Sequence, residues 1–166
     1  TKLALEDAIG LAGAVDREPP GERGVSPAHA ARYWGIPVPE YFDRADAWPL
    51  DPQGEVAVIA MIESAEGVNN IRSILAEVKG ISAIFIGPHD LSTSLGYPGQ
   101  PEHPETEKAV QRVLAATREF KVPCGILVFK HNVEQRVREG FQYLVIAGTP
   151  GDVEEAARLG LKAAER

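Results

Sequence analysis

Two acidic side chains stand at the ends of two successive apolar segments in this chain of 166 residues. Glu63 closes the run VAVIAMIE (56–63), and Asp90 stands three residues beyond the run ISAIFIG (81–87). If the two runs are neighbouring parallel strands, about 4.8 Å apart, their carboxyl ends meet at the sheet edge where α/β proteins bind ligands. Two carboxylates that leave further positions to water and substrate suit Mg²⁺ or Mn²⁺. The spacing therefore indicates one candidate chemistry, a two-carboxylate metal site.

A purely structural role for the same two acids is an alternative that the sequence leaves open. Glu63 could cap the helix that follows it, and Asp90 could cap the turn that begins the sequence DLS. The backbone near Asp90 adds a second element, because a helical turn opening at 90–92 would present free N–H groups to an anion such as a substrate carboxylate. A cation beside an anion-binding turn is a receptor suited to a 2-oxo acid.

Five other side chains have the chemistry for a site, and each has a structural alternative. His89 either contacts the metal or substrate or is a solvated turn residue. His103 precedes a proline in EHPE and is expected to start a helix, while His131 is expected near the rim of the strand ends. Arg23 in GERG either faces the substrate or fixes its loop through ion pairs. Cys124 lies inside the apolar run CGILVF and is expected in the core.

Four apolar runs form the scaffold that must position these residues. They are 56–63, 81–87, 123–129 and 143–149. Their nearly continuous Val- and Ile-rich character favours parallel strands covered on both faces. Helical patterns lie between and after them: one led by Ser64 as N-cap, then 104–120, a short polar segment at 131–139, and 151–165. The Lys and Arg side chains of 130–138 are expected to form a solvated helix face. Repeated strand–helix units predict an α/β fold with a parallel sheet, either open and doubly wound or closed into a barrel.

The Pro-rich segment 17–55 interrupts this pattern. Only a short helix near SPAHAARYW is expected within it, and the segment could serve as a lid, an oligomer contact or a linker. Its aromatic side chains are expected to cluster, either at a subunit contact or against the chain's own barrel. They are Tyr33, Trp34, Tyr41, Phe42 and Trp48.

The order of elements predicts a partial barrel. An amphipathic helix at residues 5–15 opens the sequence without a strand before it, whereas the other strong helices follow strands. Four strands are too few to close an eight-stranded barrel. Residues 1–166 are therefore expected to form one partial barrel domain that carries the excursion at 17–55.

The composition narrows the classes of partner. A net charge of −7 argues against nucleic acid and against an anionic membrane as the main partner, and it is compatible with a divalent cation. The single cysteine excludes a disulfide within the chain, which favours a reducing, cytoplasmic setting. No apolar stretch approaches the roughly 20 residues that cross a bilayer, and the charged N-terminal sequence TKLALEDAIG is unlike a signal peptide.

A long pattern in the sequence closely resembles one enzyme family. The stretch MIESAEGVNNIRSILAEVKGISAIFIGPHDLSTSLGYPGQPEHPE resembles the core of the HpcH/HpaI aldolases, which are class II, metal-dependent pyruvate aldolases of the phosphoenolpyruvate/pyruvate barrel superfamily. PPGERGVS resembles the loop before that family's fifth strand, and GILV and YLVIAGTPGD resemble its seventh and eighth strands. The resemblance implies a (β/α)8 TIM barrel of which this chain covers about the C-terminal half, with four parallel strands and their helices.

The resemblance also implies a reaction and a site. Glu63 and Asp90 match the protein ligands of a divalent cation (Mg²⁺, Mn²⁺ or Co²⁺), and the backbone N–H groups of His89 and Asp90 match those that receive the carboxylate of pyruvate. Such enzymes cleave 4-hydroxy-2-oxo acids to pyruvate and an aldehyde, and the metal stabilises the pyruvate enolate. They are often homo-oligomers, so the implied partners are small-molecule substrates and further copies of the chain.

Two departures from the family pattern affect the site. Met61 occupies a position where many members carry a substrate-contacting Gln. The family's catalytic His and Arg come from early barrel strands and are expected to lie outside this sequence, so no general base is assigned, and His29, His103 and His131 are not substituted for it. Two alternatives stay open. One is an acyl-CoA lyase of the citrate or malyl lyase type, which would need a basic pocket for the CoA phosphates. The other is a non-catalytic metal-binding half-barrel that needs a missing N-terminal half.

Overall fold

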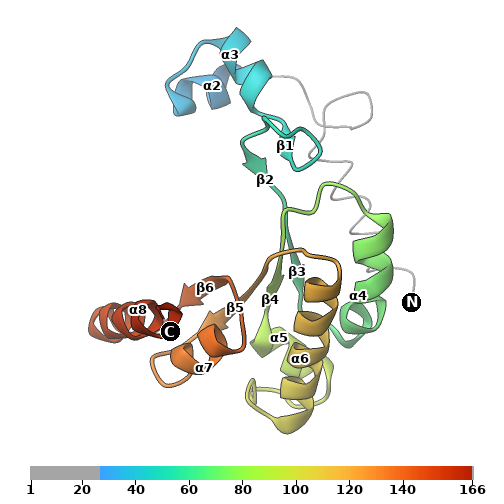
Figure 1. The fold of residues 1–166 in the computed structure, drawn as a ribbon, viewed down its shortest axis with the longest axis vertical. Coiled ribbons are helices and arrows are strands. Elements are labelled where there is room, and N and C mark those ends of the chain that lie inside the picture. Colours follow the sequence, from blue (N-terminus) through green and yellow to red (C-terminus); the bar gives the residue numbers. More distant parts are fainter. Residues whose placement is uncertain (1–26, 166) are drawn as a thin grey trace. The chain divides into compact units, whose positions relative to one another are not determined.

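The computed structural model describes residues 27–165, and Figure 1 shows the order of their helices and strands. The elements are α2 (Ala28–Trp34), α3 (Val38–Arg44), β1 (Ala47–Trp48), β2 (Val56–Ala57), β3 (Ile59–Ile62), α4 (Ala65–Glu77), β4 (Ala83–Ile86), α5 (Pro88–Ser94), α6 (Pro104–Glu119), β5 (Cys124–Val128), α7 (Val133–Arg138), β6 (Tyr143–Ile146) and α8 (Pro150–Ala164). The predicted helix at 5–15 and Arg23 lie outside the described residues. The chain divides into two compact units. One unit extends to Ala60 and also includes Asn70–Ala83, and the other consists of Met61–Asn69 and the chain from Ile84 onward.

The Pro-rich segment contains more regular structure than the sequence predicts. The expected helix near SPAHAARYW is α2, but a second helix, α3, follows it with Pro37 as its N-cap and Pro39 in its first turn. Proline is tolerated there because the first N–H groups of a helix have no intrahelical acceptor. The prediction of a single short helix is therefore wrong, because these prolines mark the start of a helix and not a break.

Only part of the predicted aromatic cluster forms. The ring centroids of Trp34 and Tyr41 lie 5.3 Å apart, and those of Tyr41 and Phe42 lie 6.3 Å apart, both pairs edge to face. Tyr33 is 90% exposed and Trp48 is 43% exposed, and neither ring contacts another ring within residues 27–165. The cluster therefore consists of three aromatic residues and not five.

The first predicted strand, 56–63, is divided at Val58. Before Val58, β2 pairs in parallel with β1, and Val56 lies opposite Ala47. Directly after Val58, β3 begins. The N–H of Val58 donates to Oγ of Ser82 at 2.8 Å, and its carbonyl accepts the N–H of Ser82 at 2.9 Å. A serine hydroxyl thus takes the place of a strand partner where the chain passes from one sheet to the next.

The strands β3, β4, β5 and β6 form one parallel sheet in that order. The register places Ile84 opposite Cys124 and Ile126 opposite Leu144. Helices occupy every connection between these strands, as parallel neighbours require. This arrangement confirms the predicted α/β class with four parallel strands.

The two faces of this sheet differ in how well they are covered. Alternate strand residues are buried, namely Ile62, Ile84, Ile86, Ile126 and Val128. On the opposite face Met61 is 55% exposed, Tyr143 is 40% exposed and Val145 is 36% exposed. Within the described residues, the second face is therefore less covered than the first at the outer strands β3 and β6.

Gly125 lies at the centre of the less covered face. It is opposite Phe85 on β4 and Tyr143 on β6, whose ring centroids are 5.7 Å apart. A Cβ atom at Gly125 would lie 2.4 Å from Cδ1 of Tyr143 and 2.7 Å from the carbonyl oxygen of the same residue. Because Gly125 has no side chain, the rings of Phe85 and Tyr143 meet across β5.

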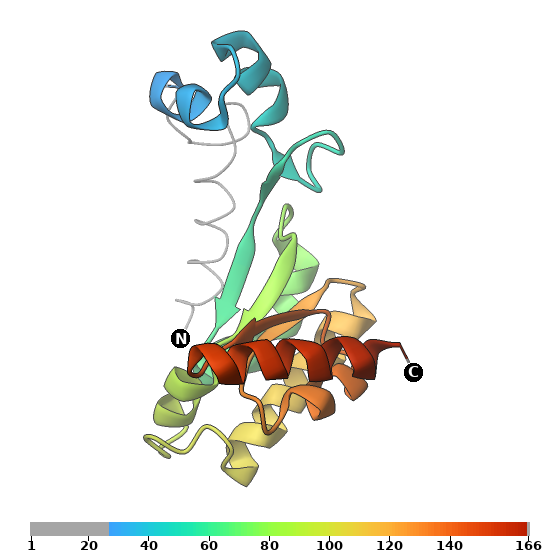
Figure 2. The same ribbon diagram turned by 90° about the vertical axis from the view of Figure 1, so that its left-hand side faces the viewer.

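The C-terminal helices α7 and α8 lie side by side (Figure 2). Gly160 of α8 makes the approach close, because a Cβ atom there would lie 3.2 Å from Cγ2 of Val133 on α7. Thr149 begins α8 as its N-cap and accepts the N–H of Asp152 through its hydroxyl oxygen at 3.3 Å. Across residues 27–165, no helix combines the length and the apolar character that a membrane span needs.

Candidate metal and substrate site

The ends of β3 and β4 are held at the same level of the sheet. The N–H of Gly87, the residue after β4, donates to the carbonyl of Ile62, the last residue of β3, at 3.1 Å. Glu63 follows Ile62 directly, and Asp90 lies in the first turn of α5, which begins directly after Gly87. The structure therefore brings both predicted acids to one edge of the sheet.

The side chain of Glu63 lies over the backbone that joins β4 to α5. A Cβ atom at Gly87 would lie 3.2 Å from Cβ of Glu63 and 3.3 Å from its carboxylate oxygen Oε2. The same position would lie 3.5 Å from the sulfur of Met61. Met61 and Glu63 are two residues apart and share one face of the strand end. The thioether therefore lies beside the carboxylate, at the position where the family resemblance places a substrate contact.

Neither acid caps a helix, so the structural alternative for this pair is wrong. Oγ of Ser64 accepts the N–H of Gly67 at 3.0 Å and caps α4, which confirms the predicted N-cap. Gly87 is the N-cap of α5, and no side chain bonds to that helix start. Glu63 and Asp90 are both exposed, and within residues 27–165 neither has a hydrogen bond or an ion pair. Two carboxylates without a partner thus share one sheet edge.

Asp152 shows what a carboxylate engaged at a helix start looks like in this chain. Its Oδ2 atom accepts a 2.6 Å hydrogen bond from the hydroxyl of Thr149. This hydrogen bond lowers the pKa of the Asp152 carboxyl from its ordinary value. Asp152 therefore belongs to the start of α8, whereas Glu63 and Asp90 have no such hydrogen bond within residues 27–165.

The pair fits a divalent cation through its oxygen donors. Carboxylate oxygens are the preferred ligands of Mg²⁺ and Mn²⁺, and Mg²⁺ often takes one or two protein carboxylates, with water and substrate in the other positions. Within the part of the chain that the structure describes, no group of three or more His, Cys, Asp or Glu residues could hold a metal.

Backbone donors lie next to the pair. The first N–H groups of a helix lack intrahelical acceptors, and Pro88 has no N–H. The N–H of Leu91 is used by the carbonyl of Gly87 at 3.0 Å, whereas those of His89 and Asp90 have no backbone acceptor within residues 27–165. Two donors are therefore available beside the two carboxylates.

A pocket of about 590 Å³ beside His89 was not predicted from the sequence. His89, the residue before Asp90, lines it together with Glu102, His103, Phe129 and His131. Nε2 of His131 lies 2.5 Å from Oε1 of Glu102, and this contact lowers the pKa of the Glu102 carboxyl. His131 lies near the rim of the strand ends, as expected. The sequence does not predict its pairing with Glu102, which lies in the connection between α5 and α6.

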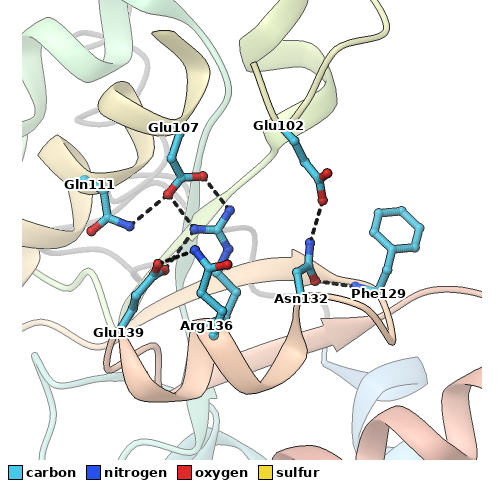
Figure 3. A network of polar contacts seen from close by, with 8 residues as sticks. Glu102, Glu107, Gln111, Phe129, Asn132, Arg136 and Glu139 are labelled. Atoms are coloured by element: carbon cyan, nitrogen blue, oxygen red, sulfur yellow. Dashed lines mark hydrogen bonds and ion pairs between the residues drawn. The ribbon is translucent and has the colours of Figure 1, made fainter. Parts of the chain in front are cut away.

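Asn132 fixes the loop that carries two residues of this pocket (Figure 3). Its Oδ1 atom accepts the N–H of Phe129 at 2.9 Å, and its Nδ2 atom donates to Oε1 of Glu102 at 3.1 Å. The loop after β5 is therefore tied to the connection between α5 and α6.

Arg136 corrects the expectation that the basic residues of 130–138 face solvent. Its side chain is 6% exposed, and its terminal nitrogens donate to both carboxylate oxygens of Glu107 at 2.7 Å each and to Glu139 at 2.9 Å (Figure 3). These hydrogen bonds lower the pKa of the Glu107 carboxyl. The ion pair joins α6 to α7.

His103 and Cys124 have the structural roles predicted for them. Nδ1 of His103 accepts the N–H of Glu105 at 3.2 Å and caps α6. Cys124 is 1% exposed, and burial raises the pKa of its thiol to about 11. The thiol is therefore a core group.

Comparison with known proteins identifies the family. Residues 4–153 match the sequence model of the HpcH/HpaI aldolase/citrate lyase family, and the chain belongs to this family. It is 36% identical over 122 residues to a 5-keto-4-deoxy-D-glucarate aldolase of Citrobacter koseri and 37% identical over 122 residues to one of Escherichia fergusonii. These alignments cover 74% of this chain but 44% of each relative, so the chain spans less than half the length of these aldolases.

Solved structures agree with this assignment. An HpcH/HpaI aldolase/citrate lyase family protein from Burkholderia cenocepacia matches with a TM-score of 0.73 and 29% identity, over 98% of this chain and 62% of that one. An HpcH/HpaI aldolase from Desulfitobacterium hafniense matches with a TM-score of 0.69 and 28% identity, over 98% of this chain and 60% of that one. The four-stranded sheet and its helices are thus part of a fold of the HpcH/HpaI TIM-barrel type.

Proposed function

We propose that this chain carries the metal- and 2-oxo-acid-binding part of a divalent-metal-dependent aldolase. The reaction is the cleavage of a carbon–carbon bond in 4-hydroxy-2-oxo acids, which yields pyruvate and an aldehyde. The observation that carries the proposal is the unpartnered pair Glu63 and Asp90 at adjacent strand ends. Membership of an aldolase/citrate lyase family and similarity to 5-keto-4-deoxy-D-glucarate aldolases support a lyase.

Each group at the strand ends has a role in this proposal. The carboxylates of Glu63 and Asp90 would hold Mg²⁺, Mn²⁺ or Co²⁺. When bound, such a cation supplies Lewis-acid chemistry by drawing electron density from the oxygens of a 2-oxo acid. The N–H groups of His89 and Asp90 would receive the substrate carboxylate and fix its orientation. Met61 would offer an apolar contact where a glutamine stands in many relatives.

No residue of this chain is assigned as the general base that takes the proton of the 4-hydroxyl group. His103 caps α6 through Nδ1, and His131 is paired with Glu102, so both imidazoles have other partners. The proposal therefore concerns binding of the cation and of the 2-oxo acid by this chain, and the complete reaction needs a base from elsewhere in the protein.

The acyl-CoA alternative has less support from the geometry. A CoA diphosphate would need cationic side chains. The pocket beside His89 has no lysine or arginine among its lining residues. Lys130 lines a neighbouring pocket of about 440 Å³, but it is paired with Glu155.

The cellular setting and assembly complete the proposal. The unpaired, buried Cys124 suits a reducing compartment such as the cytoplasm. The apolar side chains on the less covered sheet face, among them Met61, Tyr143 and Val145, support burial against further polypeptide, such as the other strands of a barrel of this family. A homo-oligomer is part of the proposal because the family resemblance implies one.

Titration of the intact protein with MnCl₂ by calorimetry tests this function. Glu63→Gln and Asp90→Asn each remove one charged oxygen ligand with little change in volume, so each is expected to weaken Mn²⁺ binding more than about tenfold. Glu134→Gln on α7 removes an acid that pairs with Arg138 and is the matched control. Equal Mn²⁺ affinity in all four proteins would show that the pair is not a metal site.

A further inference from the structure

A side chain of α5 caps the start of α4. Oγ of Ser94, the last residue of α5, accepts the N–H of Ala65 at 3.0 Å, although the two residues are 29 positions apart in the chain. Ala65 is the first residue of α4, and its N–H has no acceptor within that helix. Ser64 uses its own hydroxyl for the N–H of Gly67. The start of α4 is therefore capped both from its own segment and from α5.

The hydrogen bond between Ser94 and Ala65 lies close to both candidate metal ligands along the chain. Ala65 comes two residues after Glu63, and Ser94 comes four residues after Asp90. Residues four apart on a helix share one face, with their Cβ atoms about 5–6 Å apart. The other hydrogen bond described above joins the ends of β3 and β4, which come before both acids. The two acids are therefore enclosed between two hydrogen bonds that join the same two segments.

The hydrogen bond at the strand ends restrains only the near end of α5. The helix follows Gly87 directly and has seven residues, which rise by about 10 Å. Asp90 lies about 4.5 Å along this axis, so a displacement of about 1 Å at Ser94 would move Asp90 by about 0.4 Å if α5 tilted at Gly87. Distances between a metal ion and its ligands are held within about 0.2 Å. A hydrogen bond at the far end of α5 therefore affects how well Asp90 is placed for a cation.

Other contacts hold α5 to the core, and they differ from the contact of Ser94. Leu91 and Ser92 are both 0% exposed, and Oγ of Ser92 donates to the carbonyl of His89 at 2.7 Å. These contacts bury one face of α5 and stabilise the helix itself. Ser94 is exposed, so its hydrogen bond adds little to the core. Its expected effect is on the orientation of α5 relative to the chain after Glu63.

We infer that Ser94 is a positioning residue of the candidate metal centre. Its hydroxyl holds the end of α5 at the start of α4 and thereby sets the separation of the Glu63 and Asp90 carboxylates. Ser94 does not bind the cation itself. The inference rests on the proposed function, because it requires that these two acids form the metal site.

Calorimetric titration of the intact protein with MnCl₂ tests the role of Ser94, and urea unfolding without metal is measured alongside it. Ser94→Ala removes the acceptor for the N–H of Ala65 and is expected to weaken Mn²⁺ binding about three- to tenfold, as the loss of one hydrogen bond predicts. Ser94→Thr keeps a hydroxyl group and is expected to bind Mn²⁺ as the unchanged protein does. Ser73→Ala is the matched control, because Ser73 is an exposed serine of α4 whose side chain has no hydrogen bond within residues 27–165.

A merely structural role of Ser94 gives a different result. If Ser94→Ala lowers the urea midpoint but leaves the Mn²⁺ affinity of the folded protein unchanged, Ser94 stabilises the fold without positioning the acids, and the inference is wrong. Weaker binding that Ser94→Thr fails to restore, or equal weakening in Ser73→Ala, also overturns it.

A second ligand variant tests whether Ser94 acts through Asp90. In Asp90→Asn the charged oxygen that α5 supplies is already lost, so adding Ser94→Ala is expected to weaken Mn²⁺ binding by a smaller factor than in the unchanged protein. Electron paramagnetic resonance of the free Mn²⁺ measures these weaker affinities. An equal factor in both backgrounds would show that Ser94 does not act through Asp90.

Glu63→Gln distinguishes failure of this inference from failure of the proposed function. If Glu63→Gln weakens Mn²⁺ binding and Ser94→Ala does not, Ser94 has no positioning role and the aldolase proposal stands. If Glu63→Gln and Asp90→Asn both bind Mn²⁺ as tightly as the unchanged protein, the pair is not a metal site. The proposed function is then wrong, and the role of Ser94 is refuted with it.

Discussion

Replacement of Arg136 by methionine tests how α7, and with it the loop that carries His131, is held against α6. Loss of one partner from a fully buried ion pair costs about 3–5 kcal/mol. The side chains left behind, Glu107 and Glu139, are 30% and 22% exposed, so water restores part of their hydration. Methionine also fills part of the vacated volume. We therefore expect Arg136→Met to lower the free energy of unfolding by about 2–3 kcal/mol.

A double-mutant cycle isolates the ion pair from the packing. Glu107→Gln leaves Arg136 with Glu139 as its remaining carboxylate partner, and the two substitutions together are expected to cost less than the sum of the single changes by about 1–2 kcal/mol. Urea unfolding followed by circular dichroism measures all four proteins. A cost below about 0.5 kcal/mol for Arg136→Met, or additive costs, would refute the reasoning.

The pH dependence of this cost has a definite sign. The hydrogen bonds from Arg136 lower the pKa of the Glu107 carboxyl. A carboxyl whose folded-state pKa lies below its unfolded value, about 4.3, stabilises the fold above that value and loses this contribution as pH falls through the folded pKa. The stability difference between the unchanged protein and Arg136→Met is therefore expected to be complete at about pH 7 and to shrink below about pH 4.

Two further outcomes follow from the sheet. Gly125→Ala places a methyl group against the ring and the carbonyl oxygen of Tyr143. It is expected to lower the free energy of unfolding, measured in urea, by about 1–3 kcal/mol. An unchanged urea midpoint would contradict the close approach of Gly125 to Tyr143. The thiol of Cys124 has a pKa raised to about 11 by burial, so at pH 8 its alkylation by iodoacetamide is expected to be more than about a hundredfold slower in the native protein than in 8 M urea. Labelling at equal rates in both conditions would show that Cys124 is not a core residue.

The sequence predicts the scaffold well because the signal for it is local. The apolar runs at 81–87 and 123–129 contain β4 and β5, and Ser64 caps the helix after β3 as expected. The helix α3 is missed because proline is interpreted as a break although it is tolerated at a helix start.

The candidate site is predictable only in part. The residue types and their spacing indicate Glu63 and Asp90, but only the structure shows that neither caps a helix. The pairing of His131 with Glu102 and the burial of Arg136 depend on contacts between residues about 30 positions apart. No helical or strand period in the sequence contains that information.

The hydrogen bond between Gly87 and Ile62 fixes the register of β3 and β4, and this register sets the positions of Glu63 and Asp90 relative to each other. One residue inserted within β3 would advance Glu63 by about 3.3 Å and turn its side chain to the other face. Extra residues in the turn between α4 and β4 leave this hydrogen bond and both strand ends as they are. Changes of chain length in this region therefore fall into two kinds. Those within the strands separate Glu63 from Asp90, and those in the connection do not.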